Sequence, residues 1–197
     1  MLLGEYECTS LIGAGTFATV LLGRQKVTNT PVAIKKIPRN NFNDPDAENR
    51  FERECNLIRE MDHPFIAEFY DVIQDDKNYY IIMEYVENGN MLDYVNKNGE
   101  LQEIQVRHYF CQLISVLEYL HEVKKVAHRD LKAENVLLDT HYNIRLIDFG
   151  LSNLYTDENP YLKTACGSPG MFLSQKNYNI YLTKLYMCLI QKHYDCL

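Results

Sequence analysis

The sequence predicts an α+β fold of two lobes, in which a small lobe with an antiparallel sheet and one helix precedes a lobe that is mainly helical. Short runs of β-branched and aromatic residues, separated by turn signals, fill the first third of the chain. After Gly89 the apolar residues recur instead at helical spacing. With 197 residues, the chain is long enough for one domain or for two small lobes that share an interface.

The small lobe begins with three short β-prone runs, which predict an antiparallel meander because turn-forming residues separate them. These runs are residues 6–12, 19–25 and 31–37. Between residues 46 and 61 the apolar period changes to that of an amphipathic helix. Two further strand-like runs, 64–74 and 78–86, are joined by a polar turn and predict a hairpin.

The second lobe is marked by a long apolar stripe that predicts a helix over residues 102–121. The stripe consists of Val106, Phe110, Leu113, Leu117 and Leu120. Two short strand-like runs follow, at residues 135–138 and 144–148.

A break in the pattern at residues 87–90 places the joint between the lobes. We therefore expect a small lobe at residues 1–87 and a partial large lobe at 88–169. From residue 170 the composition shifts to Tyr, Asn, Lys and Leu, so residues 170–197 are expected to form a divergent tail.

The composition and charge are those of a globular protein. Hydrophobic residues make up 46% and charged residues 24% of the chain, far from the composition of disordered proteins. The net charge of -7 argues against broad attraction to nucleic acids or anionic membranes, so we expect neither as a partner. No apolar run approaches the roughly 18 to 20 residues that span a bilayer.

The cysteines and the N-terminus indicate the compartment. The six cysteines show no Cys-x-x-Cys or mixed Cys/His ligand spacing. The first residues lack the basic start and long apolar run of a signal peptide. We therefore expect reduced thiols and a cytoplasmic protein, with the nucleus as the alternative compartment.

A glycine-rich segment, IGAGTFATV at residues 12–20, lies between two predicted strands. A dinucleotide-binding loop would be followed by a helix, and the strand that follows here disfavours that interpretation. Because Gly13 and Gly15 lack side chains, the backbone N–H groups of such a hairpin can reach phosphate oxygens. The segment therefore predicts a nucleotide-covering hairpin.

The run VAIKK places Ala33 and Lys35 on the same face of a strand. We expect Ala33 to admit a flat ring, with Lys35 beside it. In the following helix, Glu54 falls within the apolar stripe, where a carboxylate needs a cationic partner. Lys35 is the natural candidate, and the pair would hold the ammonium group toward the α- and β-phosphates of ATP. The alternative is a surface lysine and a tolerated glutamate.

Two further motifs, HRDLKAEN at residues 128–135 and DFG at 148–150, follow the hairpin and VAIK in this order. Together they form the protein-kinase signature set, so the chain resembles the eukaryotic protein kinases over residues 6–169. The resemblance implies a protein-kinase-like two-lobe fold. It also implies an ATP- and Mg²⁺-dependent protein serine/threonine kinase, which transfers the γ-phosphoryl group to a protein hydroxyl.

The resemblance assigns catalytic and metal-binding roles residue by residue. Asp130 would accept the proton of the substrate hydroxyl, and Lys132 would steady the transferred phosphoryl group. Asn135 and Asp148 would hold Mg²⁺ that bridges the phosphates. Lys35 completes the catalytic set together with Glu54.

The resemblance also implies an adenine site at the backbone of residues 84–86, with Met83 at the back. Leu137 or Leu138 would be one apolar wall, although core packing is the alternative role for these aliphatic residues. The full ATP-binding set is expected to be Ile12, Gly13, Ala14, Gly15, Thr16, Phe17, Ala18, Thr19, Val20, Ala33, Lys35, Met83, Glu84, Val86 and Leu138.

Three longer motifs indicate which group of protein kinases the chain resembles. They are HRDLKAENVLLD, DFGLSN and YLKTACGSP. They are similar to the calcium/calmodulin-dependent group, close to the AMP-activated and microtubule-affinity-regulating kinases. Thr164 then matches the activation-loop threonine that an upstream kinase phosphorylates, and its phosphate would pair with Arg129. The alternative is an unmodified surface threonine. The implied partners are this upstream kinase and a protein substrate with Ser or Thr.

Four places depart from the family pattern. Ala18 stands where many kinases have a third glycine, Asn90 where relatives often have a glutamate, and Ile147 where this branch usually has alanine. The fourth departure is the Ala-Pro-Glu motif that follows GSP in the family. Its positions hold Leu173, Ser174 and Gln175.

The last departure leads us to expect a kinase domain that is truncated after the activation loop and impaired in phosphotransfer. The apolar stripe on residues 102–121 would then face water, at a cost in stability. A short amphipathic helix at residues 182–189 could cover little of it. The alternative function is a catalytically dead nucleotide-binding fragment that acts as a regulatory, partner-binding module.

Overall fold

The structure is a computed structural model of the 197-residue chain, and it describes residues 2–15, 18–42, 47–128, 131–148 and 153–154. The chain divides into two compact units. The first comprises residues 1–62 and 67–86, and the second comprises residues 63–66 and 87–197. The domain ranges 1–87, 88–169 and 170–197 stay a prediction.

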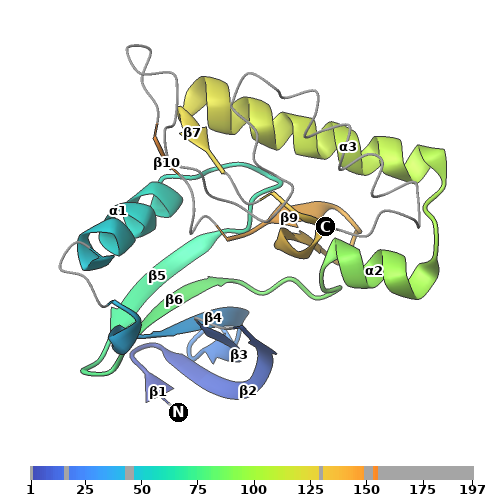
Figure 1. Cartoon of the computed structure of the whole chain (residues 1–197). Helices are drawn as coiled ribbons and strands as arrows, with labels where there is room; N and C mark the ends of the chain where they lie inside the picture. Colours follow the sequence, from blue (N-terminus) through green and yellow to red (C-terminus); the bar gives the residue numbers. More distant parts are fainter. Residues whose placement is uncertain (1, 16–17, 43–46, 129–130, 149–152, 155–197) are drawn as a thin grey trace. The chain divides into compact units, whose positions relative to one another are not determined.

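The first unit is built on an antiparallel sheet, which has six strands in the order β1-β2-β3-β4-β6-β5 within the described residues (Figure 1). The expected meander is confirmed as β2, β3 and β4, and β6 then pairs with β4 so that β5 forms the far edge. The strands are β1 (Leu2–Leu3), β2 (Tyr6–Ala14), β3 (Thr19–Gln25), β4 (Pro31–Pro38), β5 (Phe69–Gln74) and β6 (Asn78–Glu84).

Helix α1 (Ala47–Arg59) packs against one face of this sheet. Its Phe51 and Cys55 are buried with the β6 residues Tyr79 and Ile81. The helix was expected to reach residue 61 but ends two residues earlier. The backbone N–H groups of residues 60 and 61 donate to carbonyls three positions back, which is the tighter bonding that often closes a helix.

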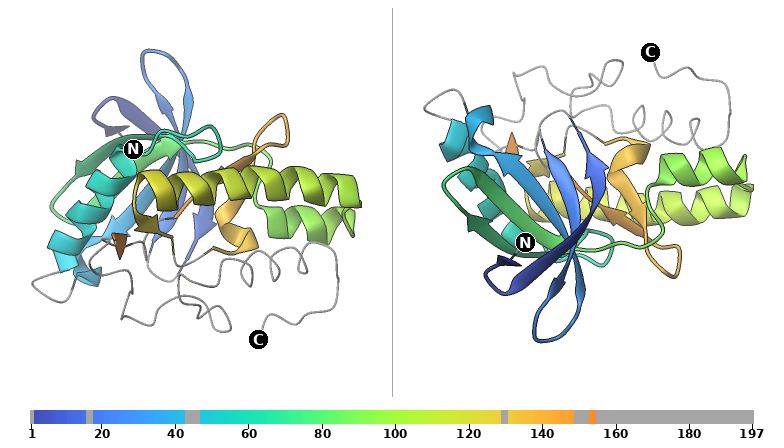
Figure 2. Two further views of the ribbon diagram at one scale, coloured as in Figure 1. Left: turned by 90° about the horizontal axis from the view of Figure 1, so that it is seen from above. Right: turned by 90° about the horizontal axis from the view of Figure 1, so that it is seen from below.

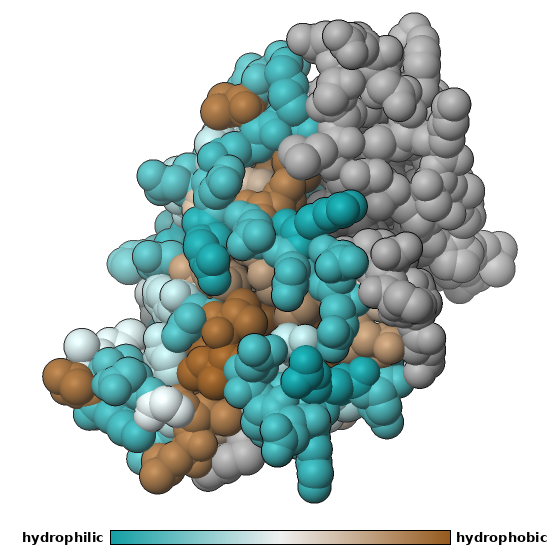
Figure 3. All heavy atoms as spheres, turned by 90° about the vertical axis from the view of Figure 1, so that its left-hand side faces the viewer, coloured by the Kyte–Doolittle hydropathy of each residue, from teal (hydrophilic) through white to brown (hydrophobic). Residues whose placement is uncertain are grey.

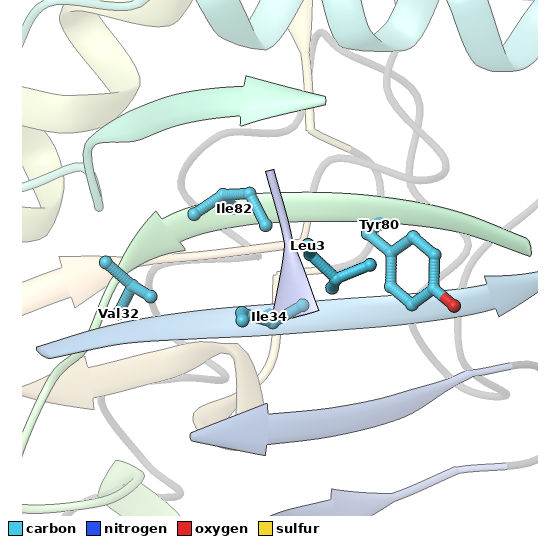
Figure 4. Close-up of a cluster of buried hydrophobic side chains, with 5 residues drawn as sticks. All are labelled: Leu3, Val32, Ile34, Tyr80 and Ile82. Atoms are coloured by element: carbon cyan, nitrogen blue, oxygen red, sulfur yellow. The ribbon is translucent and has the colours of Figure 1, made fainter. Parts of the chain in front are cut away.

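A second apolar cluster lies on the other side of the sheet, and the short strand β1 completes it. Leu3 is buried among Ile34, Tyr80 and Ile82, with Val32 at the end of the cluster (Figure 4). Sequence patterns did not predict this two-residue strand, because so short a run has no period.

The second unit contains two neighbouring helices, α2 (Met91–Asn98) and α3 (Glu103–Glu118), which run side by side (Figure 2). Gly99 separates them with a φ of 85°, a conformation that glycine adopts without strain. A capping box between Gln102 and Gln105 starts α3. A π-helical turn (Tyr119–Val123) extends it, so the predicted helix over 102–121 is largely confirmed.

The apolar stripe of α3 is buried except at Phe110, which is half-buried, so the expectation that the stripe would face water is wrong for its other four members. Val106 and Leu120 have no exposed surface, and Leu113 is 3% exposed. The stripe meets apolar residues from three other segments of the same unit. They line a shared apolar cavity formed by Met91, Tyr109, Phe110, Leu113, Ala133, Val136 and Ile144.

Two small antiparallel pairs complete the second unit: β8 (Val136–Leu138) with β9 (Ile144–Leu146), and β7 (Val126–Ala127) with β10 (Asn153–Leu154). Residues 63–66 also belong here, which corrects the expected strand over 64–74. Ile66 forms a parallel bridge with Leu146, and the Leu146 N–H donates to the Phe65 carbonyl at 2.9 Å. Because this backbone is engaged by β9, β5 begins only at residue 69.

The described surface is mixed. Viewed from the left-hand side of Figure 1, hydrophilic side chains predominate around a smaller hydrophobic patch (Figure 3). None of the helices in the described ranges is both long enough and apolar enough to cross a membrane.

Candidate active site

Four residues expected at the nucleotide site share one face of the first unit's sheet. Lys35 on β4 pairs directly with Val20 on β3, and Ala33 pairs with Met83 on β6. Directly paired residues of neighbouring strands point to the same face, and so do residues two apart on one strand. Val20, Ala33, Lys35 and Met83 therefore lie on a common face.

This face is the one that α1 covers. Met83 packs at the edge of the buried cluster that contains Phe51 and Cys55 of α1. Lys35 is half-buried, and it takes part in polar or electrostatic interactions. Glu54 belongs to α1, but its side chain lies outside the described residues. The Lys35–Glu54 ion pair therefore stays a prediction.

The glycine-rich segment forms the hairpin between β2 and β3. Gly13 pairs with Val20, and the Gly15 N–H donates to the Ala18 carbonyl at 2.9 Å across the turn. A Cβ at Gly13 would meet its nearest neighbour at 3.6 Å, and so would a Cβ at Gly15. These are ordinary contact distances, so the fold itself does not require glycine at either position.

The other described residues of the glycine-rich segment are exposed or half-buried. Ile12 is 45% exposed, Ala14 is also exposed, and Ala18 and Thr19 are half-buried. Thr16 and Phe17 lie outside the described residues.

Residues 84–86, at the end of β6, are expected to contact adenine. Within them Glu84 is hydrogen-bonded to Glu68, whereas the backbone N–H of Val86 is available as a donor. The Glu84 N–H donates to the Glu68 carbonyl at 2.8 Å, and the Glu84 carboxylate accepts from the Glu68 N–H at 3.1 Å. Val86 is buried, and among the described residues no acceptor lies within hydrogen-bond reach of its backbone N–H.

In the second unit, one backbone residue connects the HRD and DFG motifs. Ile147 donates its N–H to the Asn135 carbonyl at 3.0 Å. The Ile147 carbonyl lies 3.1 Å from Nε2 of His128, whose side chain is buried. Because a carbonyl can only accept, Nε2 must carry the proton. The backbone immediately before Asp148 is thus held from both sides.

The two expected Mg²⁺ ligands differ in exposure. Asn135 is 5% exposed, whereas Asp148 is exposed and has a φ of 65°, in the left-handed region that few residues other than glycine adopt. Both offer the oxygen ligands that Mg²⁺ prefers. The described residues contain no group of three or more His, Cys, Asp or Glu side chains placed to hold a metal ion.

The burial of β8 distinguishes two candidate adenine walls. Val136 lines the internal cavity of the second unit, and Leu138 shares its strand face and has no exposed surface. Leu137 points to the opposite face and is half-buried. The geometry therefore favours Leu137 over Leu138.

A buried glutamine in α3, which no sequence motif singled out, fixes the β8–β9 hairpin. Gln112 donates from Nε2 to Oδ1 of Asn143 at 2.7 Å and accepts at Oε1 from the Ile144 N–H at 2.9 Å. The available signal was a polar residue directly before Leu113 in the apolar stripe. Such a residue needs partners if it is buried.

Asp139 organises the turn of the same hairpin. Its Oδ1 accepts from the backbone N–H groups of His141 and Asn143 at 2.9 and 2.8 Å. Its Oδ2 lies 3.3 Å from Nη2 of Arg145, which also donates to the Pro64 carbonyl. The hairpin that carries Leu137 is thus held by a continuous polar network.

Asn90 has a structural role that the sequence analysis did not assign. It is the N-cap of α2, where Oδ1 accepts from the Asp93 N–H and Nδ2 donates to the Asp93 carboxylate, both at 2.8 Å. Its carbonyl also accepts from the Tyr94 N–H.

Three residues with expected functional roles, Arg129, Asp130 and Thr164, lie outside the described residues. So do residues 170–197, which include the amphipathic helix expected at 182–189. Lys132 is half-buried, and its carbonyl accepts from the Asn135 N–H at 3.0 Å.

Comparison with known proteins supplies the context for this geometry. Residues 6–173 match the protein kinase domain family. The chain is 44% identical over 169 residues to the carbon catabolite-derepressing protein kinase of Secale cereale, covering 84% of this chain and 33% of that protein.

Two further relatives are similar. The SNF1-related protein kinase catalytic subunit alpha KIN12 of Arabidopsis thaliana is 43% identical, over 85% of this chain and 34% of its own length. The serine/threonine protein kinase OSK3 of Oryza sativa subsp. indica is 42% identical, over 85% and 32%. The chain thus spans about a third of the length of these curated relatives.

These matches confirm the resemblance and the kinase fold that the motifs predicted. The match to the family covers most of the chain, including the glycine-rich hairpin, VAIK, HRD and DFG. The name of the Oryza sativa relative agrees with the serine/threonine branch. The chain therefore belongs to the protein kinase family.

Proposed function

We propose that this chain is an ATP-dependent serine/threonine kinase domain that transfers the γ-phosphoryl group of ATP to a protein hydroxyl. The observation that carries the proposal is the pair of hydrogen bonds at Ile147. One bond ties Ile147 to the Asn135 backbone, and the other ties it to the His128 ring. The two segments that carry the candidate metal ligands Asn135 and Asp148 are therefore hydrogen-bonded to each other.

We assign nucleotide binding in the first unit to the sheet face of Lys35. Val20, Ala33 and Met83 would be apolar neighbours of adenine, and Lys35 would pair with phosphate oxygens. Gly13 and Gly15 support this assignment, because their surroundings leave room for a Cβ and the fold does not explain them. A phosphate that approaches the backbone closely would explain them.

Two backbone groups and one side chain complete the proposed adenine site. The available N–H of Val86 would donate to a ring nitrogen, while the Glu84 carbonyl would accept from the exocyclic amine. Leu137 replaces Leu138 as the apolar wall from the second unit, because Leu138 belongs to the interior.

In the second unit, Asn135 and Asp148 fit a Mg²⁺ ion by their donor chemistry, since an amide oxygen and a carboxylate are hard oxygen ligands. When bound, the ion would neutralise charge on the phosphates. Asp130 would accept the proton of the substrate hydroxyl, and Lys132 would stabilise the transferred group. Preorganised charge and positioning would then supply most of the rate.

The proposed partners are a protein with a Ser or Thr acceptor and an upstream kinase that phosphorylates Thr164. A phosphate there would add about two negative charges, which the guanidinium of Arg129 can bind bidentately. The cytoplasmic location also stays a prediction.

A phosphotransfer assay with radiolabelled ATP and a Ser/Thr peptide tests the activity of the 197-residue chain. Asp130→Asn should reduce turnover roughly 10²–10⁴-fold, the range typical of general-base removal. Asp148→Asn should raise the Mg²⁺ concentration required. The control is Asp76→Asn, which removes an exposed carboxylate of the first unit. Equal turnover of Asp130→Asn and the wild-type chain would contradict the proposal.

A non-catalytic nucleotide-binding module is the second candidate, and the residues Leu173, Ser174 and Gln175 at the Ala-Pro-Glu positions favour it. Equilibrium binding of a fluorescent ATP analogue separates the two functions. Saturable binding that Lys35→Met weakens, without phosphotransfer, would support this module instead.

A further inference from the structure

Three polar side chains from separate segments of the first unit meet at the buried hydroxyl of Tyr79. The Arg39 guanidinium donates from Nη2 to the Tyr79 hydroxyl at 2.9 Å. That hydroxyl donates to Oε1 of Glu48 at 3.1 Å, and Oε1 also accepts from the same Nη2 at 3.3 Å. The contacts form a closed triangle.

The segments that this triangle joins are the sheet and the start of α1. Tyr79 is on strand β6, between β4 and the edge strand β5, and is 5% exposed. Glu48 is in the first turn of α1, and Arg39 is in the 3-10 turn after β4. Arg39 is itself fixed to the turn between β5 and β6 by two more bonds. Its N–H donates to the Lys77 carbonyl at 2.8 Å and its Nη1 to the Asp75 carbonyl at 3.2 Å.

Aromatic packing reinforces the same point. The guanidinium of Arg39 lies 4.8 Å from the centre of the Tyr79 ring. That ring also contacts Phe42 and Phe51, with centroids 5.4 and 4.7 Å away. Phe51 is one turn along α1 from Glu48, so the helix touches Tyr79 with both a polar and an apolar group.

The burial of Tyr79 decides how much these contacts contribute. An exposed ion pair such as Arg39–Glu48, with side chains 35% and 48% exposed, contributes little by itself. Tyr79, however, is a buried residue whose hydroxyl is partly buried, and a polar group that loses its partners there is costly. Burial, together with the bond to Glu48, raises the pKa of Tyr79, so the hydroxyl remains a donor.

We propose that Arg39, Glu48 and Tyr79 form a latch that holds the beginning of α1 against β6 and so positions this helix for phosphotransfer. The proposal rests on the proposed function, because α1 carries Glu54, the expected partner of Lys35. The three residues are positioning residues, since none of them is expected to touch ATP or the substrate. Release of the latch would let α1 move away from the sheet without unfolding the sheet.

Hydrogen exchange of backbone amides in α1 tests the latch without requiring kinase activity. Tyr79→Phe removes only the hydroxyl and keeps the ring contacts, so this variant should fold. Arg39→Gln and Glu48→Gln remove the other two corners. Each should accelerate exchange in α1 about tenfold, the effect of losing a charge-assisted hydrogen bond. Exchange in β4 and β6 should stay unchanged.

Glu52→Gln is the matched control, because Glu52 is an exposed carboxylate of the same helix. It should leave exchange in α1 unchanged. The double variant Arg39→Gln with Glu48→Gln should exchange no faster than either single variant, since both break the same triangle. Wild-type exchange in Tyr79→Phe, or equal acceleration throughout the sheet, would overturn the latch.

The positioning role is read from kinetics on the same variants. The kcat for a peptide should fall about tenfold in Tyr79→Phe while the KM for the peptide stays constant, and Glu52→Gln should match wild type. Faster exchange with unchanged kcat would overturn the positioning role alone. If the wild-type chain shows no phosphotransfer, both the proposed function and the positioning role are wrong. The hydrogen-exchange data would still show whether the three residues hold α1 against β6.

Discussion

The buried ring of His128 donates a hydrogen bond from Nε2 to the carbonyl of Ile147 at 3.1 Å, which joins the HRD segment to the residue before Asp148. Without this donor the Ile147 carbonyl would lose a partner at a site that is only half-exposed. His128→Ala should therefore lower the free energy of unfolding by about 1–3 kcal/mol, measured by urea denaturation. His141→Ala, at an exposed histidine of the same unit, should change it by less than about 0.5 kcal/mol.

The stability should depend on pH through His121. Burial, and then the neighbouring His128, lower the pKa of His121 from 6.5 to about 4. The unfolded chain therefore binds a proton between these values that the folded chain does not. The contribution of neutral His121 to the free energy of unfolding is at most about 2–3 kcal/mol. It is complete above pH 6.5 and is lost as the pH falls toward 4. His121→Gln should flatten this part of the urea-denaturation profile, and an unchanged slope would contradict the assignment.

Two glycines of the small sheet should respond differently to alanine. At Gly23 a Cβ would lie 2.5 Å from Cδ1 of Ile34 and 2.9 Å from the Glu7 carbonyl, so Gly23→Ala should destabilise the chain by about 1–3 kcal/mol. Gly13→Ala meets only ordinary contacts and should leave the melting temperature nearly unchanged while weakening ATP binding. The pattern is checked by thermal denaturation and nucleotide titration, and equal destabilisation by both variants would refute it.

The leucines of β8 provide a similar contrast. Leu138→Ala opens a fully buried site and should cost about 2–5 kcal/mol in stability. Leu137→Ala should cost less stability and reduce the affinity for ATP, because that side chain lies on the other face of the strand. A loss of ATP affinity in a folded Leu138→Ala variant, with wild-type affinity in Leu137→Ala, would restore Leu138 as the adenine wall.

Gln112 should be more important for stability than an average surface residue of α3. Gln112→Ala leaves the Ile144 N–H without its acceptor, and we expect a loss of about 1–3 kcal/mol in urea denaturation. Glu118→Gln changes an exposed residue of the same helix and serves as the control. Equal stability of the two variants would show that the network is dispensable.

Much of the fold followed from local patterns. The alternation in residues 31–37 predicted which side chains of β4 share a face, and the 3.6-residue period predicted α1 and α3. The patterns failed where a distant partner decides the conformation. Residues 64–66 have strand-like composition, but β9 engages their backbone. Leu2 and Leu3 form a strand only because β2 lies beside them.

The sequence by itself determined the family of this protein and the residue types of its candidate site, because motif order and spacing are properties of the chain alone. It could not choose between Leu137 and Leu138, since that choice depends on which strand face meets the interior. It also gave no sign that Arg39, Glu48 and Tyr79 meet, because they are far apart in the chain. Only the tertiary structure showed that Leu138, and not Leu137, faces the interior, through the packing of β8 in the second unit. It also brought Arg39, Glu48 and Tyr79 together, through the packing of α1 against β6.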